Sequence, residues 1–240
     1  SNFRAGVNAG NSIASGGNFN VVVGDEAGTA ITTGDENVGV GFGALNAVTT
    51  GGYNTGIGSG SLDANTTASN NTAVGFASLG ANTTGTENTA VGALAGDAIT
   101  TSPFNTAVGK SALSANTTGN GRNTAIGRAA LAATTTGDHN TAVGMNAGEA
   151  VTTGISNTLI GGLAGDALTD ADYNIAVGYN ALTADTLGSR SVAIGVGTLE
   201  AQNFTSATDT YNIAIGHGAG AAVTTGIQNT FVGGLAGDAT

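Results

Sequence analysis

A pattern of polar, β-branched and small residues recurs along the chain about every 17 residues. Each unit opens with Asn-Thr-Ala-Val-Gly or a close variant, as at residues 71–75. Counting from this first residue, position 2 is Thr, Ile, Val or Phe, position 4 is Val or Ile in every unit except the first, and position 5 is always Gly. Two β-branched positions around a small one predict a short strand that buries positions 2 and 4, with the Thr hydroxyl bonded to neighbouring backbone or a Thr ladder. The glycine is predicted to end the strand in a conformation that a Cβ would forbid.

The repeat covers the whole chain. Ten of its spacings are 17 residues, two are 18 and one is 21. The units, here numbered as coils 1 to 14, start at Asn2, Asn20, Asn37, Asn54, Asn71, Asn88, Asn105, Asn123, Asn140, Asn157, Asn174, Ser191, Asn212 and Asn229. In stacked coils, each strand is buried against its neighbours above and below. The sequence therefore predicts an all-β fold, a parallel β-solenoid or β-roll of about fourteen 17-residue coils, as a single repeat domain over residues 1–240.

Positions 9 and 12 exchange one aliphatic side chain between them. Where position 9 is Leu, position 12 is usually polar, as in Leu79 with Asn82; where position 9 is Gly, position 12 is aliphatic, as in Gly96 with Ile99. Leu45 with Val48 is the one unit that has both. A close-packed interior with room for one such group per layer would produce this exchange, since two would overpack it and none would leave a cavity.

Two further positions predict contacts along the stack. Position 1 is Asn in thirteen units, which predicts a ladder of amides in which each bonds the next. Positions 13 to 15 read Thr-Thr-Gly in several coils, for example at residues 32–34, which predicts the turn that closes the coil.

Composition and charge narrow the possible partners. The chain has 42 Gly, no Cys and a net charge of -11, with five Lys and Arg against sixteen Asp and Glu. So few cations cannot neutralise a run of phosphates, so nucleic acid is not an expected partner. No apolar run approaches the length that spans a bilayer, so no direct membrane insertion is expected. Without cysteine, disulfide and thiolate chemistry are excluded.

No residues form a recognisable catalytic or ligand-binding motif. Residues 109–111 read Gly-Lys-Ser, but the glycine that a phosphate-binding loop needs five residues earlier is Phe104. His139 and His217 lie in different coils without a partner at catalytic spacing, and are predicted to be exposed turn residues. Acidic residues recur at position 10, where solvated edge charges explain them. The prediction is a protein that is not an enzyme, with no catalytic, cofactor or metal site.

Coil 12 carries the largest irregularity. Four extra residues lie between Leu199 and Asn212, and insertions in a solenoid form surface loops, often on the binding face. Aromatic residues beside small hydroxyl residues suggest a contact surface; a tolerated insertion is the alternative interpretation. The predicted ligand-contact residues are Phe204, Thr205, Ser206, Thr208, Asp209 and Tyr211.

The repeat resembles the head repeat of trimeric autotransporter adhesins of the YadA type, whose unit contains Asn-Ser-Val-Ala-Ile-Gly. Residues 191–195, Ser-Val-Ala-Ile-Gly, match it best, followed by residues 174–178 and 212–216. It is also similar to repeats in phage-type tail fibres. The resemblance implies a left-handed β-roll, three chains side by side, and an extracellular role in adhesion. The unit here is longer than the adhesin repeat, and neither its neck nor its membrane anchor is present in this sequence.

Three functions fit these patterns. The expected one is an extracellular adhesin or fibre segment at a cell surface or on a virion, homotrimeric and attached to a host or matrix surface through protein or glycan. An ice-binding solenoid is the alternative from another class, because Thr ladders about 4.8 Å apart can match a lattice. Against it, the paired threonines are consecutive and run into Gly, which would curve them away from a common face. A purely structural filament or tail-fibre shaft is the third.

Overall fold

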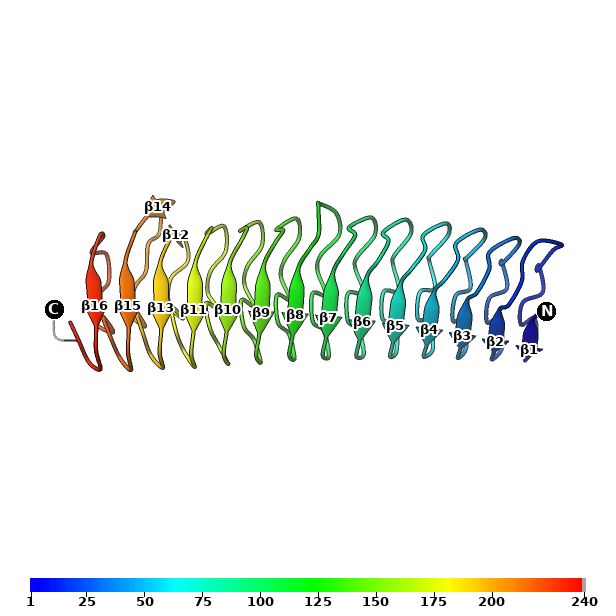
Figure 1. Cartoon of the computed structure of the whole chain (residues 1–240), viewed down its shortest axis with the longest axis horizontal. Coiled ribbons are helices and arrows are strands. Elements are labelled where there is room, and N and C mark those ends of the chain that lie inside the picture. Colours follow the sequence, from blue (N-terminus) through cyan, green and yellow to red (C-terminus); the bar gives the residue numbers. More distant parts are fainter. Residues whose placement is uncertain (239–240) are drawn as a thin grey trace. The chain divides into compact units, whose positions relative to one another are not determined.

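The computed structural model describes residues 1–238, which form an all-β fold of short parallel strands linked by turns, with no helix in that range. The fold is a parallel β-solenoid of about fourteen coils that repeat about every 17 residues, as the sequence predicted. Each coil contributes one three-residue strand, and the rest of the coil returns the chain to the start of the next strand (Figure 1).

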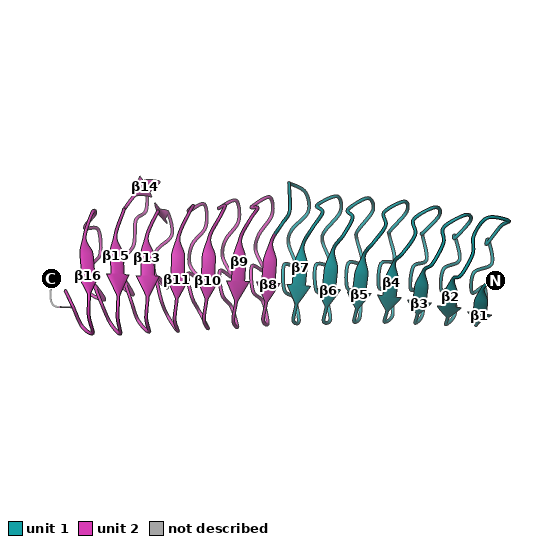
Figure 2. Ribbon diagram, viewed as in Figure 1, with its two compact units in different colours: residues 1–122 teal, residues 123–240 magenta. Residues whose placement is uncertain are grey.

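The chain divides into two compact units, residues 1–122 and 123–240, whose boundary follows the second of the two 18-residue coils (Figure 2). The strands of unit 1 are β1 (Phe3–Ala5), β2 (Val21–Val23), β3 (Val38–Val40), β4 (Thr55–Ile57), β5 (Thr72–Val74), β6 (Thr89–Val91) and β7 (Thr106–Val108). Those of unit 2 are β8 (Thr124–Ile126), β9 (Thr141–Val143), β10 (Thr158–Ile160), β11 (Ile175–Val177), β12 (Gly188–Ser189), β13 (Val192–Ile194), β14 (Thr208–Asp209), β15 (Ile213–Ile215) and β16 (Thr230–Val232).

Within each unit, equivalent residues of successive coils lie side by side. Thr72 pairs with Thr89 and Val74 with Val91, so every strand position forms a ladder parallel to the stack. Strands β12 and β14 form a separate two-stranded parallel sheet, because coil 12 carries the insertion. Side chains at the same position of successive coils are therefore about 4.8 Å apart, the spacing between strands.

The prediction that positions 2 and 4 point into the coil is wrong. Position 3 is the buried residue of the strand: Ala73 and Ala90 are fully buried, while their neighbours on both sides are half-buried or exposed. The strand has the expected period of two, but position 3 faces the interior, where most coils have a small residue; the larger Val22 and Leu159 are buried there in coils that have Gly at position 9. The β-branched residues therefore form the outer face of the sheet.

The asparagine ladder is confirmed. The backbone N–H of Asn37 donates to Oδ1 of Asn20 at 2.9 Å, and the Asn37 side-chain amide donates to the carbonyl of Gly51 at 2.9 Å. Both asparagines are buried, so each coil satisfies a buried polar group of the next one.

The glycine at position 5 has the role that the sequence predicted. Gly75 has a φ of 136°, and a Cβ on it would lie 2.5 Å from the carbonyl oxygen of Gly92 in the next coil. Any other residue would push the coils apart at the end of the strand.

Positions 9 and 12 share one interior space, as predicted. Leu79 and Ile99 are fully buried, and a Cβ on Gly96 would lie 3.0 Å from Cδ1 of Ile99 and 3.1 Å from Cδ2 of Leu79. Ile99 therefore fills the space beside Gly96 of the same coil, next to Leu79 of the preceding coil. Leu79 has a φ of 49°, in the left-handed region. The burial of its side chain offsets the cost of this backbone conformation.

Candidate functional site

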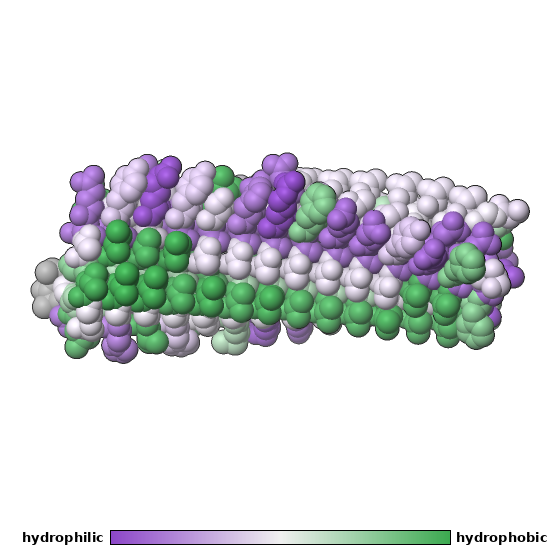
Figure 3. Space-filling view, viewed as in Figure 1, coloured by the Kyte–Doolittle hydropathy of each residue, from purple (hydrophilic) through white to green (hydrophobic). Residues whose placement is uncertain are grey.

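The outer face of the sheet is the most regular surface of each unit. It consists of the side chains at positions 2 and 4, here called the outward face. In unit 1 these are Phe3, Ala5, Val21, Val23, Val38, Val40, Thr55, Ile57, Thr72, Val74, Thr89, Val91, Thr106 and Val108. In unit 2 they are Thr124, Ile126, Thr141, Val143, Thr158, Ile160, Ile175, Val177, Val192, Ile194, Ile213, Ile215, Thr230 and Val232. Figure 3 shows the position 4 residues as an apolar band along the strands of each unit.

The outward face has no ionisable side chain, although the chain as a whole has a net charge of -11. Several of its aliphatic residues are exposed, for example Ile57 at 40% and Ile160 at 39%, and most Val residues of the face are half-buried. Among the described residues, the threonine hydroxyls of this face have no hydrogen-bond partner within the chain. The face therefore offers alternating ranks of aliphatic groups and free hydroxyls to whatever lies against it.

The insertion of coil 12 places the six predicted contact residues in different environments. Thr205, Ser206, Asp209 and Tyr211 are exposed, and Thr208 is half-buried. Phe204 is only 7% exposed. The expectation that Phe204 is an anchor on the surface is therefore not supported by its position, because its ring is turned into the protein.

A buried polar network holds the base of the insertion. Oδ1 of Asp185 accepts hydrogen bonds from the backbone N–H groups of Gly188 and Phe204, both at 3.0 Å, and its Oδ2 accepts one from the side-chain amide of Gln202 at 2.6 Å. Oε1 of Gln202 in turn accepts a hydrogen bond from the side-chain amide of Asn212 at 2.8 Å. Ser191 stands where other coils have the ladder asparagine, so Gln202 supplies the amide oxygen that Ser191 lacks, and its own amide donates to Ser191 Oγ at 2.9 Å. The insertion is thus part of the folded interior at one end.

The exposed end of the insertion contributes to an aromatic and charged cluster. The guanidinium of Arg190 lies 4.8 Å from the ring centre of Tyr173 and 6.0 Å from that of Tyr211, and its Nε donates to Asp209 Oδ1 at 2.9 Å. The bond to Asp209 raises the pKa of Arg190. Arg190 was not among the predicted contact residues. The signal in the sequence is that Arg190 ends coil 11, while Tyr173 and Tyr211 end the coils on either side of it.

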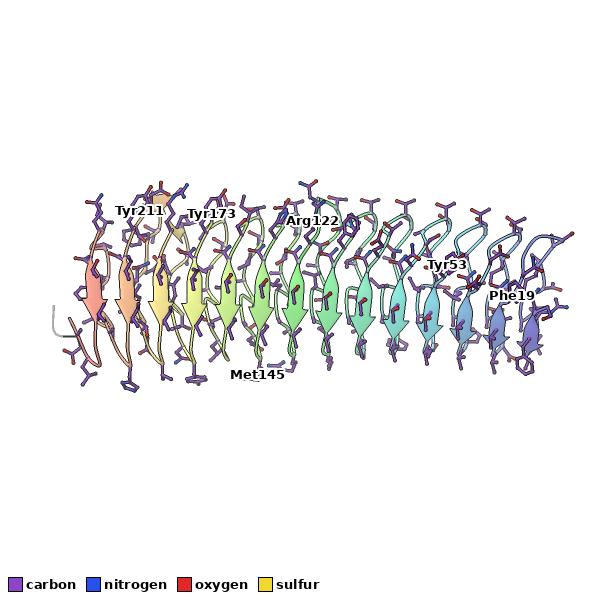
Figure 4. All side chains as sticks on the ribbon, in the orientation of Figure 1. Phe19, Tyr53, Arg122, Met145, Tyr173 and Tyr211 are labelled. Carbon is purple, nitrogen blue, oxygen red and sulfur yellow. The ribbon has the colours of Figure 1, made fainter. Side chains whose placement is uncertain are left out.

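The aromatic residues occupy two separate ridges. Tyr173 and Tyr211, each directly before the first residue of the next coil, lie on the opposite side of the strands from Met145 at position 6 (Figure 4). His139 and His217 are both exposed, as predicted. Between residues 1 and 238 no group of three or more His, Cys, Asp or Glu side chains is arranged to hold a metal ion. Over the same residues no helix could cross a membrane.

Comparison of the chain with protein-family models, with curated proteins and with solved structures found no significant match.

Proposed function

We propose that the chain is a segment of an extracellular, non-enzymatic homotrimeric fibre or adhesin, in which the outward faces of three chains pack on one another. The observation that supports this proposal is the uncharged, partly aliphatic outward face, repeated in every coil. Soluble proteins rarely leave large contiguous apolar patches exposed, and such patches mark interaction surfaces.

The energy available from covering this face is appreciable. Fully burying a Val or Ile stabilises by about 1.5–3 kcal/mol, so covering a residue that is 40% exposed, as Ile57 is, contributes roughly 0.6–1.2 kcal/mol. In unit 1 Ile57 and Val91 are exposed to this extent and together give roughly 1–2 kcal/mol, and the half-buried Val23, Val40, Val74 and Val108 add smaller amounts. Burial over one unit therefore offsets part of the cost of association, about 4–15 kcal/mol.

A second copy of the chain is the partner whose spacing fits best. Its coils repeat at the same strand spacing, so every rung of one chain can meet a rung of another without loss of register. The resemblance to trimeric adhesin heads and tail fibres agrees with three chains. In such an assembly the turn ridges would stay exposed and present the same groups many times, so weak contacts to a host or matrix surface would add up.

The test is the mass in solution, measured by light scattering. The wild-type chain should have about three times the mass of the 22.8 kDa monomer. Val74→Lys combined with Val91→Lys places two charges on the outward face and should give a monomer with an unchanged β-type circular dichroism spectrum. Thr67→Lys with Thr84→Lys adds the same charge at exposed position 14, and this control should remain trimeric. A folded wild-type monomer would contradict the proposal.

Ice binding by a single chain is the second candidate, because the outward face alternates Thr with Val or Ile. The consecutive threonines at positions 13 and 14 run into Gly, but the structure turns Thr at position 2 outward, beside the aliphatic residues of position 4. If the wild type is a monomer and shows thermal hysteresis that Val74→Lys with Val91→Lys abolishes, ice binding replaces the fibre proposal.

A further inference from the structure

A notch interrupts the turn ridge of unit 1 at position 6. Phe42 and Phe76 stand two coils apart at this position, each 60% exposed, and Ser59 occupies the same position in the coil between them. The two rings flank an open space of about 450 Å³. Two coils correspond to about 9.6 Å, so a group midway between the rings would lie about 4.8 Å from each.

The floor of the notch is backbone held by hydrogen bonds. The N–H of Gly60 donates to the carbonyl of Phe42 at 2.9 Å, and that of Ala77 to the carbonyl of Ser59 at 2.9 Å. A Cβ on Gly60 would meet nothing within 4 Å, so the space above the floor is open. The notch is therefore preformed and does not need the turns to move.

Carboxylates are among the residues that line the notch. Asp63 belongs to the same coil as Ser59, and Asp97 lies two coils further on, with Gly80 at the same position of the coil between them. Glu26 also lines the space, and no Lys or Arg does. Oδ1 of Asp97 is buried without a hydrogen-bond partner among the described residues, and burial raises the pKa of this carboxyl. The notch combines aromatic walls with uncompensated negative charge.

We propose that this notch binds a quaternary ammonium group of the choline type. A cation within about 6 Å of an aromatic face is attracted by the ring, and two rings at the spacing of two coils can hold one between them. A quaternary ammonium has no N–H groups, so it loses no hydrogen bonds between phenyl rings, which cannot accept them. A primary ammonium is strongly hydrated and would lose that hydration in the notch. The lining carboxylates of Asp63 and Asp97 add charge complementarity. This ligand goes beyond the fibre function and does not depend on how many chains associate.

Unit 2 has a related notch of about 390 Å³, in which Tyr179 and His217 flank Val196 and Glu200 supplies the carboxylate. It has an imidazole in place of one phenyl wall and one acidic lining residue instead of three. We expect it to contribute the smaller part of any binding.

The experiment is a titration of the full chain with choline chloride, observed by saturation transfer to the choline methyl protons. The neutral isostere 3,3-dimethylbutan-1-ol should bind at least tenfold more weakly, a difference of about 1.4 kcal/mol. Phe42→Leu with Phe76→Leu keeps apolar bulk but removes the rings, and should abolish most of the signal; Asp63→Asn should weaken it several-fold. Phe104→Leu, an exposed ring of the same unit at position 17, is the matched control and should bind as the wild type does.

Equal binding of choline and its neutral isostere would overturn the proposal, and so would a signal that the double Phe variant leaves unchanged. Light scattering of the same sample separates this result from the fibre proposal. A monomer that binds choline would refute only the trimer, and a trimer that does not bind it would refute only the notch.

Discussion

The shared interior space of positions 9 and 12 can be tested by moving its aliphatic group from one wall to the other. Leu79→Gly removes a fully buried side chain from coil 5. Truncating a buried Leu costs about 2–5 kcal/mol, and the flexibility of Gly adds about 0.5–1 kcal/mol. Relief of the left-handed backbone at Leu79 returns about 1–2 kcal/mol. We expect a net loss of about 2–4 kcal/mol.

Adding Asn82→Ile should restore most of this loss. The new Ile would fill the space left by Leu79, as Ile99 does beside Gly96 in the next coil. It also removes the Oδ1 of Asn82, which is buried without a partner in the described structure. The carbonyl of Gly85 loses the Asn82 amide at 2.9 Å but keeps the Asn71 amide at 2.9 Å, so it stays satisfied. We expect the double variant to lie within about 1 kcal/mol of the wild type.

Urea unfolding followed by circular dichroism, together with amide hydrogen exchange in coils 5 and 6, measures these effects even if the coils unfold separately. Asn82→Ile alone is the control and should destabilise by about 1–3 kcal/mol, because Leu79 and the new Ile would compete for one space. A double variant no more stable than Leu79→Gly would refute the shared space.

Three further outcomes follow from the buried groups. Ala73→Asp should destabilise by about 3–5 kcal/mol in thermal melts because position 3 faces the interior, whereas Thr72→Asp, on the outward face of the same strand, should leave the secondary structure of the chain intact. Asp185→Asn should cost about 1–3 kcal/mol and speed limited proteolysis of the insertion, since its new amide would face donors; unchanged cleavage would show that the network does not hold the loop. Asp97→Asn should raise the melting temperature at pH 7, because burial disfavours the charged carboxylate and raises its pKa; the gain should shrink as the pH falls through that pKa, and a gain that grows at low pH would contradict this sign.

Much of the fold was readable from the sequence because a solenoid repeats its local rules. The period of 17 residues, the parallel stack, the asparagine ladder, the glycine that ends each strand and the exchange between positions 9 and 12 all depend on contacts between identical positions of adjacent coils. A contact made many times leaves a visible pattern, so periodicity alone determined these features.

The direction of the strand was decided only by the tertiary structure. Alternation shows that positions 2 and 4 share a face but not which face is buried, and β-branched residues suit either. The interior is so thin that a larger side chain at position 3 requires smaller side chains at position 9 or 12. Coil 3 keeps both Leu45 and Val48 because Gly39 lies inside, and coil 10 uses Leu159 there beside Gly165.

The candidate sites depend on irregular residues, which periodicity does not describe. Phe204 looked like a surface anchor and is buried, because the insertion folds back onto Asp185. Phe42 and Phe76 are far apart in sequence, but stacking places them two coils apart, on either side of Ser59. The repeat in the sequence determined which residues of successive coils lie side by side. The packing of neighbouring coils decided which of their side chains are exposed to solvent and which contact one another.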